Sequence, residues 1–185
     1  DLRGFGRSAM PDAAPYTHAD DLHALLDQLG IATVEAVIGL SMGGEVATRF
    51  ALDHPGSLRA LVLADATVEG YEWSAEWKAV VVPVWQGARA EGLAVARARW
   101  LAHDGLFGPA REHPALAAQL ARMVEGYSGW HWLNRDPHRK GVAPARARLG
   151  QIAIPTLVLV GARDNADFQA QADLLAGGIP GARKV

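Results

Sequence analysis

The sequence of 185 residues contains no cysteine, so disulfide bonds and catalysis by a thiolate are both excluded. It also lacks a run of about 20 consecutive apolar residues, the length that a membrane-spanning helix needs. The longest apolar run, residues 79–85, is interrupted by Pro83. We therefore expect no membrane span, and we expect a cytoplasmic location, although a targeting signal would not be visible in a fragment.

Neither sign of charge dominates the composition. The 18 Lys and Arg residues and 20 Asp and Glu residues give a formal net charge of -2. Proteins that bind nucleic acids usually concentrate basic residues on one face, so no nucleic-acid partner is expected. Hydrophobic residues make up 50% of the chain, which is enough apolar material for the core of one domain of ordinary size.

Three short apolar segments predict strands, at residues 35–40, 59–65 and 155–161. The first, EAVIGL, is typical of a strand that is buried on both faces. Leucines at helical spacing predict a helix over residues 18–29, and the pattern after Ser41 predicts another. Strand, helix and strand in this order, with apolar strands, indicate an α/β fold with a parallel sheet and crossover helices.

The composition divides the chain into three parts. Residues 1–65 and 149–185 carry the predicted strands, whereas residues 66–148 are rich in Ala and Arg and hold all six tryptophans. Within this middle part four helices are predicted, over residues 73–82, 88–103, 113–126 and 143–150. Residues 66–148 are therefore expected to form a helical insertion between two parts of one sheet domain.

Residues 39–44 read GLSMGG and place Ser41 between a predicted strand and a predicted helix. In that context G-x-S-x-G is a nucleophile elbow, a strained turn that exposes a serine hydroxyl. Side chains at Gly39 and Gly43 are expected to collide with the neighbouring strand and helix. The unpaired N–H of Met42, at the helix N-terminus, could stabilise an oxyanion. A phosphate-binding loop is disfavoured, because no lysine follows Ser41 and no G-x-G-x-x-G is present.

An acidic residue follows the third predicted strand, since Asp164 lies three residues after Gly161. Catalytic groups of open parallel sheets gather at the carboxyl ends of the strands, which makes Asp164 the candidate acid. Asp167 is a rival, but it lies one turn further along the chain and is expected at the surface.

Four segments together make the sequence similar to the α/β-hydrolase superfamily. They are DLRGFGRS at residues 1–8, GLSMGG at 39–44, LRALVLAD at 58–65 and IPTLVLVGARD at 154–164. The chain looks most like the branch of enol-lactonases, haloperoxidases and small-ester hydrolases. The resemblance implies strands five to seven and the start of strand eight of that fold, with residues 66–148 as a helical cap.

The resemblance also implies a Ser-His-Asp triad, in which Ser41 attacks and Asp164 orients the histidine, with the N–H of Met42 as one oxyanion donor. In the family pattern the other oxyanion donor would precede Asp1 and the histidine would follow Val185. The 185 residues are therefore expected to be a fragment that is inactive by itself. No cofactor and no metal are expected.

Seven histidines are present, and none of them follows Asp164. They are His18, His23, His54, His103, His113, His131 and His138. His54 ends the helix that Ser41 begins, about 18 Å away at 1.5 Å per residue, too far to take the proton of Ser41. His131, Asp136 and His138 could be drawn as metal ligands, but a loop with exposed polar residues is the simpler interpretation.

Aromatic residues of the insertion are candidates for an apolar pocket above the serine. The candidates are Tyr71, Trp73 and Trp77 in one group, and Trp130 and Trp132, with Tyr127 beside them, in a second group. Packing of cap helices against one another accounts for these aromatics equally well. An arginine of the insertion would suit a substrate carboxylate, but the sequence singles out none of them.

The sequence thus predicts a serine hydrolase of esters, lactones or similar acyl compounds, with a small-molecule acyl substrate as its partner. The alternatives are a non-catalytic ligand-binding or receptor-like relative, a carbon–carbon bond hydrolase and an acyltransferase on the same scaffold. Epoxide hydrolases and dehalogenases are disfavoured, because those relatives carry aspartate where this chain has Ser41. The sequence does not indicate an oligomeric state.

Overall fold

The computed structural model describes residues 1–139, 141 and 143–185, which form two compact units. The sheet unit consists of Pro15–Glu72 and His138–Val185, and the helical unit consists of Asp1–Ala14 and Trp73–Pro137. The second range of the helical unit, Trp73–Pro137, thus begins later and ends earlier in the chain than the predicted insertion over residues 66–148. It also includes the N-terminal segment, which the sequence assigns to the sheet domain.

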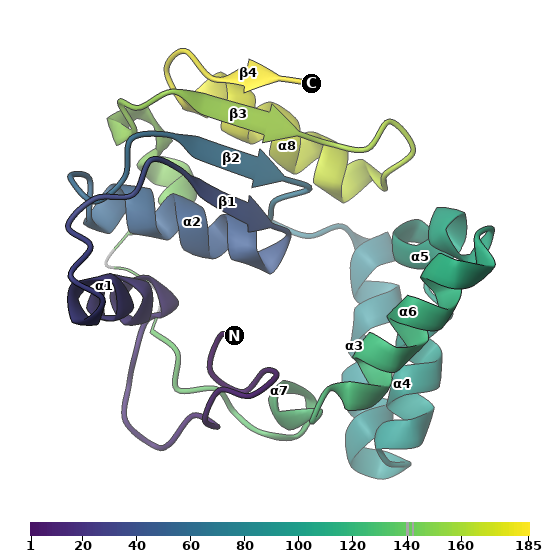
Figure 1. Ribbon diagram of the computed structural model, residues 1–185. Helices are drawn as coiled ribbons and strands as arrows, with labels where there is room; N and C mark the ends of the chain where they lie inside the picture. The colour runs from purple at the N-terminus through teal and green to yellow at the C-terminus, as the bar shows by residue number, and fades with distance from the viewer. Residues whose placement is uncertain (140, 142) are drawn as a thin grey trace. The chain divides into compact units, whose positions relative to one another are not determined.

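Four parallel strands form the sheet: β1 (Val37–Leu40), β2 (Leu61–Ala64), β3 (Thr156–Leu159) and β4 (Arg183–Lys184). Their order across the sheet is their order in the chain (Figure 1). A parallel neighbour requires the chain to return to the same end of the sheet, and helices make this return after β1 and after β3. The predicted α/β class with a parallel sheet and crossover helices is confirmed.

Three helices belong to the sheet unit: α1 (His18–Gln28), α2 (Met42–Asp53) and α8 (Ala166–Gly178). The first begins after Thr17, whose hydroxyl accepts a hydrogen bond from the N–H of Asp20 at 2.9 Å. Helix α2 packs against β1 and β2, α1 packs against α2, and α8 packs against β3 and β4. Phe50 of α2, Leu63 of β2 and Leu175 of α8 are fully buried in the core that these elements share.

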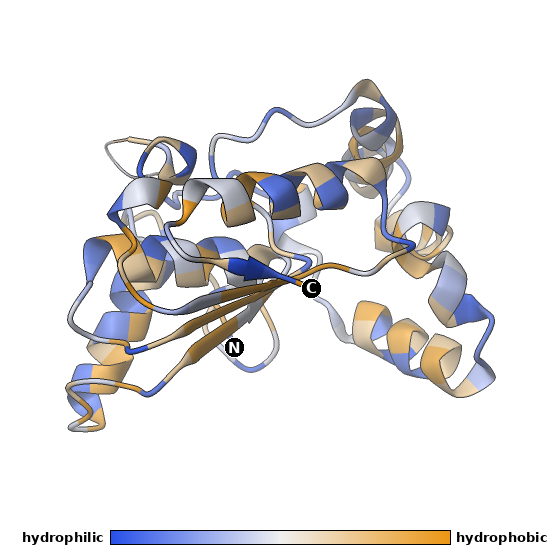
Figure 2. Ribbon diagram, turned by 90° about the horizontal axis from the view of Figure 1, so that it is seen from above, coloured by the Kyte–Doolittle hydropathy of each residue, from blue (hydrophilic) through white to orange (hydrophobic). Residues whose placement is uncertain are grey.

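The two faces of the sheet differ in burial. Leu61, Leu63 and Val158 lie in the core, whereas Ile38 and Leu40 are 73% and 65% exposed. Figure 2 shows β1 to β3 as apolar ribbons and β4 as a hydrophilic one. The expectation that the first strand is buried on both faces is therefore wrong for the described part of the chain, in which Gly39 is the only fully buried residue of β1.

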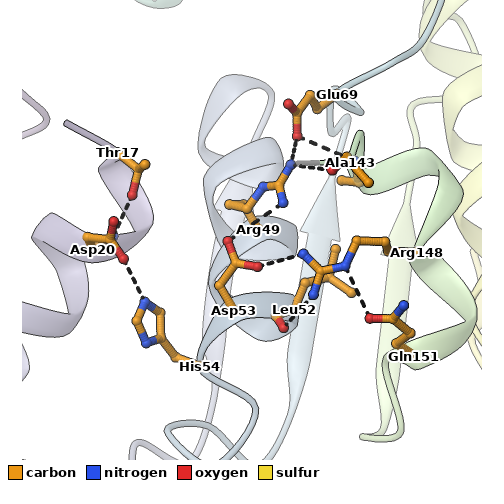
Figure 3. Close-up of polar contacts among 11 residues, drawn as sticks. Thr17, Asp20, Arg49, Leu52, Asp53, His54, Glu69, Ala143, Arg148 and Gln151 are labelled. Atoms are coloured by element: carbon orange, nitrogen blue, oxygen red, sulfur yellow. Dashed lines mark hydrogen bonds and ion pairs between the residues drawn. The ribbon is translucent and has the colours of Figure 1, made fainter. Parts of the chain in front are cut away.

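A buried polar network ties the segment after the helical unit to α2 (Figure 3). Arg49 forms an ion pair with Glu69, and both residues are only 7% exposed. Arg49 also donates to the carbonyl of Ala143 at 3.0 Å. Nearby, Arg148 donates to Asp53 at 2.6 Å. These contacts hold Ala143 and Arg148 against α2.

The same segment forms two short 3₁₀ turns, η1 (Ala145–Ala147) and η2 (Leu149–Gln151), and not the predicted α-helix over residues 143–150. Backbone donors of this segment are engaged by Glu69. The N–H of Ala145 donates to its carboxylate at 3.3 Å and the N–H of Arg146 to its carbonyl at 3.1 Å. Tertiary partners thus take part in satisfying the backbone here, which favours a tight turn over a longer helix.

The helical unit contains five helices: α3 (Ala75–Ala90), α4 (Leu93–Leu101), α5 (Asp104–Arg111), α6 (Pro114–Gly126) and α7 (Trp130–Leu133). Helix α3 continues through Pro83, beyond its predicted end, because Val84 and Ala88 are buried with Trp132 in the core of this unit. Gly92, at φ 96°, then separates α3 from α4 where one helix over residues 88–103 is predicted. Within the described residues, no helix has both the length and the apolarity needed to cross a membrane.

The N-terminal segment packs within the helical unit through aromatic stacking. The ring of Phe5 stacks on Tyr127 at 5.2 Å and on His131 at 4.4 Å between ring centroids. Gly4 has φ 81°, and a Cβ there would lie 2.5 Å from Cε1 of His131. Both the backbone conformation and the close approach of the His131 imidazole therefore require glycine at position 4.

Candidate active site

Ser41 occupies the turn between the end of β1 and the start of α2, at φ 51° and ψ -119°. This left-handed φ is rare for a residue other than glycine and persists only where the surroundings hold it. The N–H of Ser41 donates to the carbonyl of Ala64 at 2.9 Å. The Ser41 carbonyl accepts from the N–H groups of Gly44 at 2.8 Å and Thr67 at 3.1 Å. Contacts from β2 and from the segment after it therefore hold the strained turn.

The glycines of GLSMGG differ in the space available for a side chain. A Cβ on Gly39 would lie 2.3 Å from the carbonyl oxygen of Gly43, and a Cβ on Gly44 would lie 2.2 Å from Cβ of Ala66. A Cβ on Gly43 meets no atom within 4 Å. The expected collision is confirmed at Gly39 and is wrong at Gly43, because the close approach of α2 to the segment after β2 occurs at Gly44.

Met42 is the first residue of α2 and is 41% exposed. An N–H in the first turn of a helix has no acceptor within the helix and lies at the positive end of the helix dipole. The side chain of Ser41 makes no capping hydrogen bond to this turn. An anion at the helix N-terminus would therefore meet an available backbone donor next to the serine hydroxyl.

Asp164 lies in the loop that joins β3 to α8. Its N–H donates to the carbonyl of Gly161 at 2.9 Å, and its Oδ1 accepts from the N–H of Asn165 at 2.7 Å. Asn165 in turn caps α8, since its side-chain oxygen accepts from the N–H of Phe168 at 3.2 Å. The carboxyl group of Asp164 is thus held in place by the start of the following helix.

The pKa of Asp164 is raised to about 6. Burial is the largest cause, followed by a hydrogen bond with the side chain of Asp65; the N–H of Asn165 acts in the opposite direction, and the charge of Asp65 raises the pKa further. A carboxyl group with these surroundings binds a nearby cation more strongly than an isolated carboxylate in water does, because it has lost part of its hydration.

Asp65 has no role predicted from the sequence, yet its side chain binds the loop that carries Asp164 and helps to raise the pKa of Asp164. Asp65 follows β2 directly, has φ 39°, and accepts the N–H of Gly161 at 2.9 Å through Oδ1. One signal in the sequence could have found it: like Asp164, it is an aspartate at the carboxyl end of an apolar strand, where functional groups of parallel sheets gather.

Asp167, the rival acid, is 6% exposed, so its expected position at the surface is wrong. It lies in the first turn of α8 and accepts the hydroxyl of Tyr71 at 2.9 Å. The pKa of Tyr71 is raised to about 12, first by burial and then by this hydrogen bond. Tyr71, predicted to line a pocket, is thus bound to α8 within the sheet unit.

The other candidate pocket residues lie in the helical unit. Trp73 stacks on Trp77 at 4.4 Å between ring centroids. Trp132 is buried in the core of that unit, and Trp130 lies edge-on to His131 at 4.9 Å. These four tryptophans therefore belong to two separate stretches of one helical unit, and their contacts include packing among its own helices.

The histidines of the sheet unit contact one another or a carboxylate, and His18 among them is buried. His54 contacts Asp20 at 3.1 Å and stacks on His23 at 4.2 Å, and His18 stacks on His138 at 4.8 Å. Within the helical unit, Nε2 of His131 lies 3.5 Å from Asp136, and burial lowers the pKa of His131. Within the described part of the chain, no group of three or more candidate ligands could hold a metal ion.

Comparison with known proteins gives the chain a family. The family model for the alpha/beta hydrolase fold matches residues 1–185. The chain is similar to the sn-1-specific diacylglycerol lipase ABHD11 of Mus musculus, with 30% identity over 173 residues, covering 87% of this chain and 54% of that protein. It is also 37% identical, over 84 residues, to the homoserine O-succinyltransferase of Xanthomonas campestris, covering 43% of this chain and 23% of that protein.

Among solved structures, the enol-lactonase from Burkholderia xenovorans LB400 is similar, with a TM-score of 0.73, 29% identity, and coverage of 100% of this chain and 69% of that one. The chain thus spans only part of the length of the proteins that it matches. It belongs to the α/β-hydrolase family and is related to enzymes named as lipase and lactonase.

Proposed function

We propose that the protein to which this α/β-hydrolase chain belongs is a serine hydrolase of esters, lactones or similar small acyl compounds. The strained turn at Ser41 carries the proposal. Its backbone conformation costs free energy that neighbouring contacts have to offset, and such strain is typical of residues that act on a ligand. The lipase and the enol-lactonase among the similar proteins support the substrate class.

In the proposed reaction, Ser41 Oγ attacks the acyl carbon while a histidine takes its proton. This histidine is proposed to lie outside the 185 residues. The N–H of Met42 stabilises the oxyanion of the tetrahedral intermediate, and Asp164 orients the histidine and stabilises its cation. Collapse of the intermediate expels the alcohol, which takes the proton from the histidine, and water then hydrolyses the acyl-enzyme by the same sequence of steps.

Labelling with a fluorophosphonate tests the first step. The full-length protein is expected to form a covalent adduct, and Ser41→Ala is expected to abolish it. Ser8→Ala is the matched control, because the Ser8 hydroxyl donates to the carbonyl of Asp1 within the N-terminal segment, and its removal should leave the labelling rate unchanged. Equal labelling of wild type and Ser41→Ala would refute the assignment, and an unlabelled wild type would favour a non-catalytic ligand-binding protein.

Acyl transfer is a second candidate, favoured by the match to the succinyltransferase over 43% of the chain. The two functions share the acyl-enzyme and differ in whether water or an alcohol accepts the acyl group. Product analysis with a thioester or ester donor, in the presence and absence of an amino alcohol, separates them. Release of free acid at an unchanged rate in both conditions supports hydrolysis, whereas a predominant acylated alcohol supports transfer.

A further inference from the structure

Asp65 lies at the junction of the two loops that carry the proposed catalytic residues. Strand β2 is the neighbour of both β1 and β3 in the sheet. At its carboxyl end, the carbonyl of Ala64 accepts the N–H of Ser41 at 2.9 Å, and the N–H of Asp65 donates to the carbonyl of Leu159 at 2.9 Å. The backbone of residues 64 and 65 therefore joins the Ser41 turn to the end of β3.

The conformation of Asp65 departs from that of an ordinary strand end. Its φ of 39° lies in the left-handed region, which aspartate tolerates better than most residues but which still costs free energy. This conformation is accompanied by a hydrogen bond from the N–H of Gly161 to its Oδ1 at 2.9 Å. Gly161 is the residue whose carbonyl accepts the N–H of Asp164. The Asp65 side chain thus fixes the loop that presents Asp164.

Asp65 also acts on the carboxyl group of Asp164, because its side-chain hydrogen bond and its charge are, after burial, among the causes that raise the pKa of Asp164. The negative charge of Asp65 disfavours the ionised form of the Asp164 carboxyl group. Each group is also anchored to a backbone donor, Asp65 to Gly161 and Asp164 to Asn165. Backbone donors of the loop after β3 therefore anchor both aspartates.

We propose that Asp65 is a positioning residue for the acid of the catalytic triad: its carboxylate accepts the N–H of Gly161 and so holds the loop after β3 that carries Asp164. The inference rests on the proposed function of Asp164. When the histidine becomes a cation, its charge favours the ionised form of Asp164. In that step the carboxyl O–H bond of Asp164 breaks and a water molecule takes the proton, forming one new O–H bond.

The charged surroundings of Asp164 come from three elements. Asp65 lies at the end of β2, Arg163 precedes Asp164 in its own loop, and Asp167 lies in the first turn of α8, where it accepts the hydroxyl of Tyr71. Of these groups, Asp65 contributes to the pKa of Asp164, both by its hydrogen bond and by its charge. A change at Asp65 is therefore expected to move the pH dependence of the reaction.

The test compares kcat, KM and the pH profile of kcat/KM for the full-length protein and four variants: Asp65→Asn, Asp65→Ala, Asp164→Ala and Asp173→Asn. Asparagine keeps an acceptor for Gly161 and offers an N–H to Asp164, so Asp65→Asn should keep kcat at pH 8 within about 3-fold and shift the acidic limb of kcat/KM to lower pH by about 0.5 units or more. Asp65→Ala should lower kcat by about 10-fold or more, with KM changed by less than about 3-fold, since the acid is displaced but the substrate contacts are not. Asp173→Asn, on the exposed side of α8 and paired with Lys184, should behave as wild type.

Two outcomes overturn the inference. In the first, both Asp65 variants have the kcat and the pH profile of wild type, even if their melting temperatures fall. That result would show a merely structural role, which changes stability alone. The other is loss of activity in Asp65→Ala with full activity in Asp164→Ala, which would make Asp65 the acid itself. Retained activity in Ser41→Ala refutes the proposed function instead, and this inference with it, so the two failures are distinguished by the serine variant.

Discussion

A methyl group placed at Gly39 or at Gly43 gives a direct test of how the serine turn is packed. At Gly39 the added Cβ would lie 2.3 Å from the carbonyl oxygen of Gly43 and 2.7 Å from Cα of Gly44. Both contacts are with backbone, which cannot rotate away as a side chain does. At Gly43 the same methyl group meets no atom within 4 Å. The two substitutions add the same atom and differ only in the space around it.

The expected effects on the free energy of unfolding have opposite signs. Gly39→Ala should destabilise the protein by about 3 kcal/mol, the upper part of the range for overpacking, because the first turn of α2 has to move away from β1. Gly43→Ala should stabilise it by about 0.5 kcal/mol, since alanine has the better helix propensity and loses less backbone entropy. For a protein of this size the melting temperatures of the two variants should differ by on the order of 10 °C.

Thermal unfolding followed by circular dichroism, on the full-length protein and both variants, measures this difference. Gly39→Ala should also lower the rate of labelling at Ser41, because a displaced first turn of α2 moves the N–H of Met42 away from the hydroxyl. Equal melting temperatures for the two variants, or a Gly39→Ala variant as stable as wild type, would refute the account of the packing between β1 and α2.

Two further predictions concern charged groups of the sheet unit. Glu69→Ala should lower the free energy of unfolding by about 3 kcal/mol, because it leaves the buried Arg49 without its carboxylate partner (Figure 3). Glu35→Ala removes an exposed ion pair with Arg59 and should lower it by less than about 0.5 kcal/mol. Urea unfolding measures both values, and similar losses of stability would contradict the role of burial. Asp164→Asn should raise the melting temperature at pH 8 and leave it close to that of wild type at pH 4. The raised pKa of about 6 means that Asp164 favours the folded state below its ordinary pKa of 3.8 and that this contribution is lost as the pH rises through 6, while asparagine has no proton to lose. A variant less stable than wild type at pH 8 would contradict this prediction.

The sequence predicts the parts of the fold that depend on neighbouring residues. The apolar segments around Val37, Leu61 and Thr156 are the three long strands, and the leucine spacing after Thr17 is helix α1. The position of Ser41 follows in the same way, because a strand and a helix that meet at one residue leave that residue in the turn between them. Such features follow from side-chain periodicity and glycine placement within a few residues of the chain.

Where the interpretation from sequence differs from the structure, distant segments decide the outcome. Helix α3 passes through Pro83 because residues beyond the proline are buried against Ala96 and Trp132. Asp167 is buried because Tyr71, 96 positions earlier, donates to it. Gly43 has free space, whereas Gly44 meets Ala66 after the next strand.

The sequence alone therefore determined the α/β class, the strand-to-helix turn at Ser41 and the presence of an aspartate at the end of a strand, because each of these depends on residues that are neighbours in the chain. The tertiary structure decided which groups surround that aspartate. Asp65 and Asp164 are 99 positions apart, and the side chain of Asp65 reaches the loop that carries Asp164 because β2 and β3 are paired in parallel, which brings their carboxyl ends to the same edge of the sheet. A periodic pattern contains no information on such a contact, because it arises from the pairing of strands and not from the order of residues within one strand.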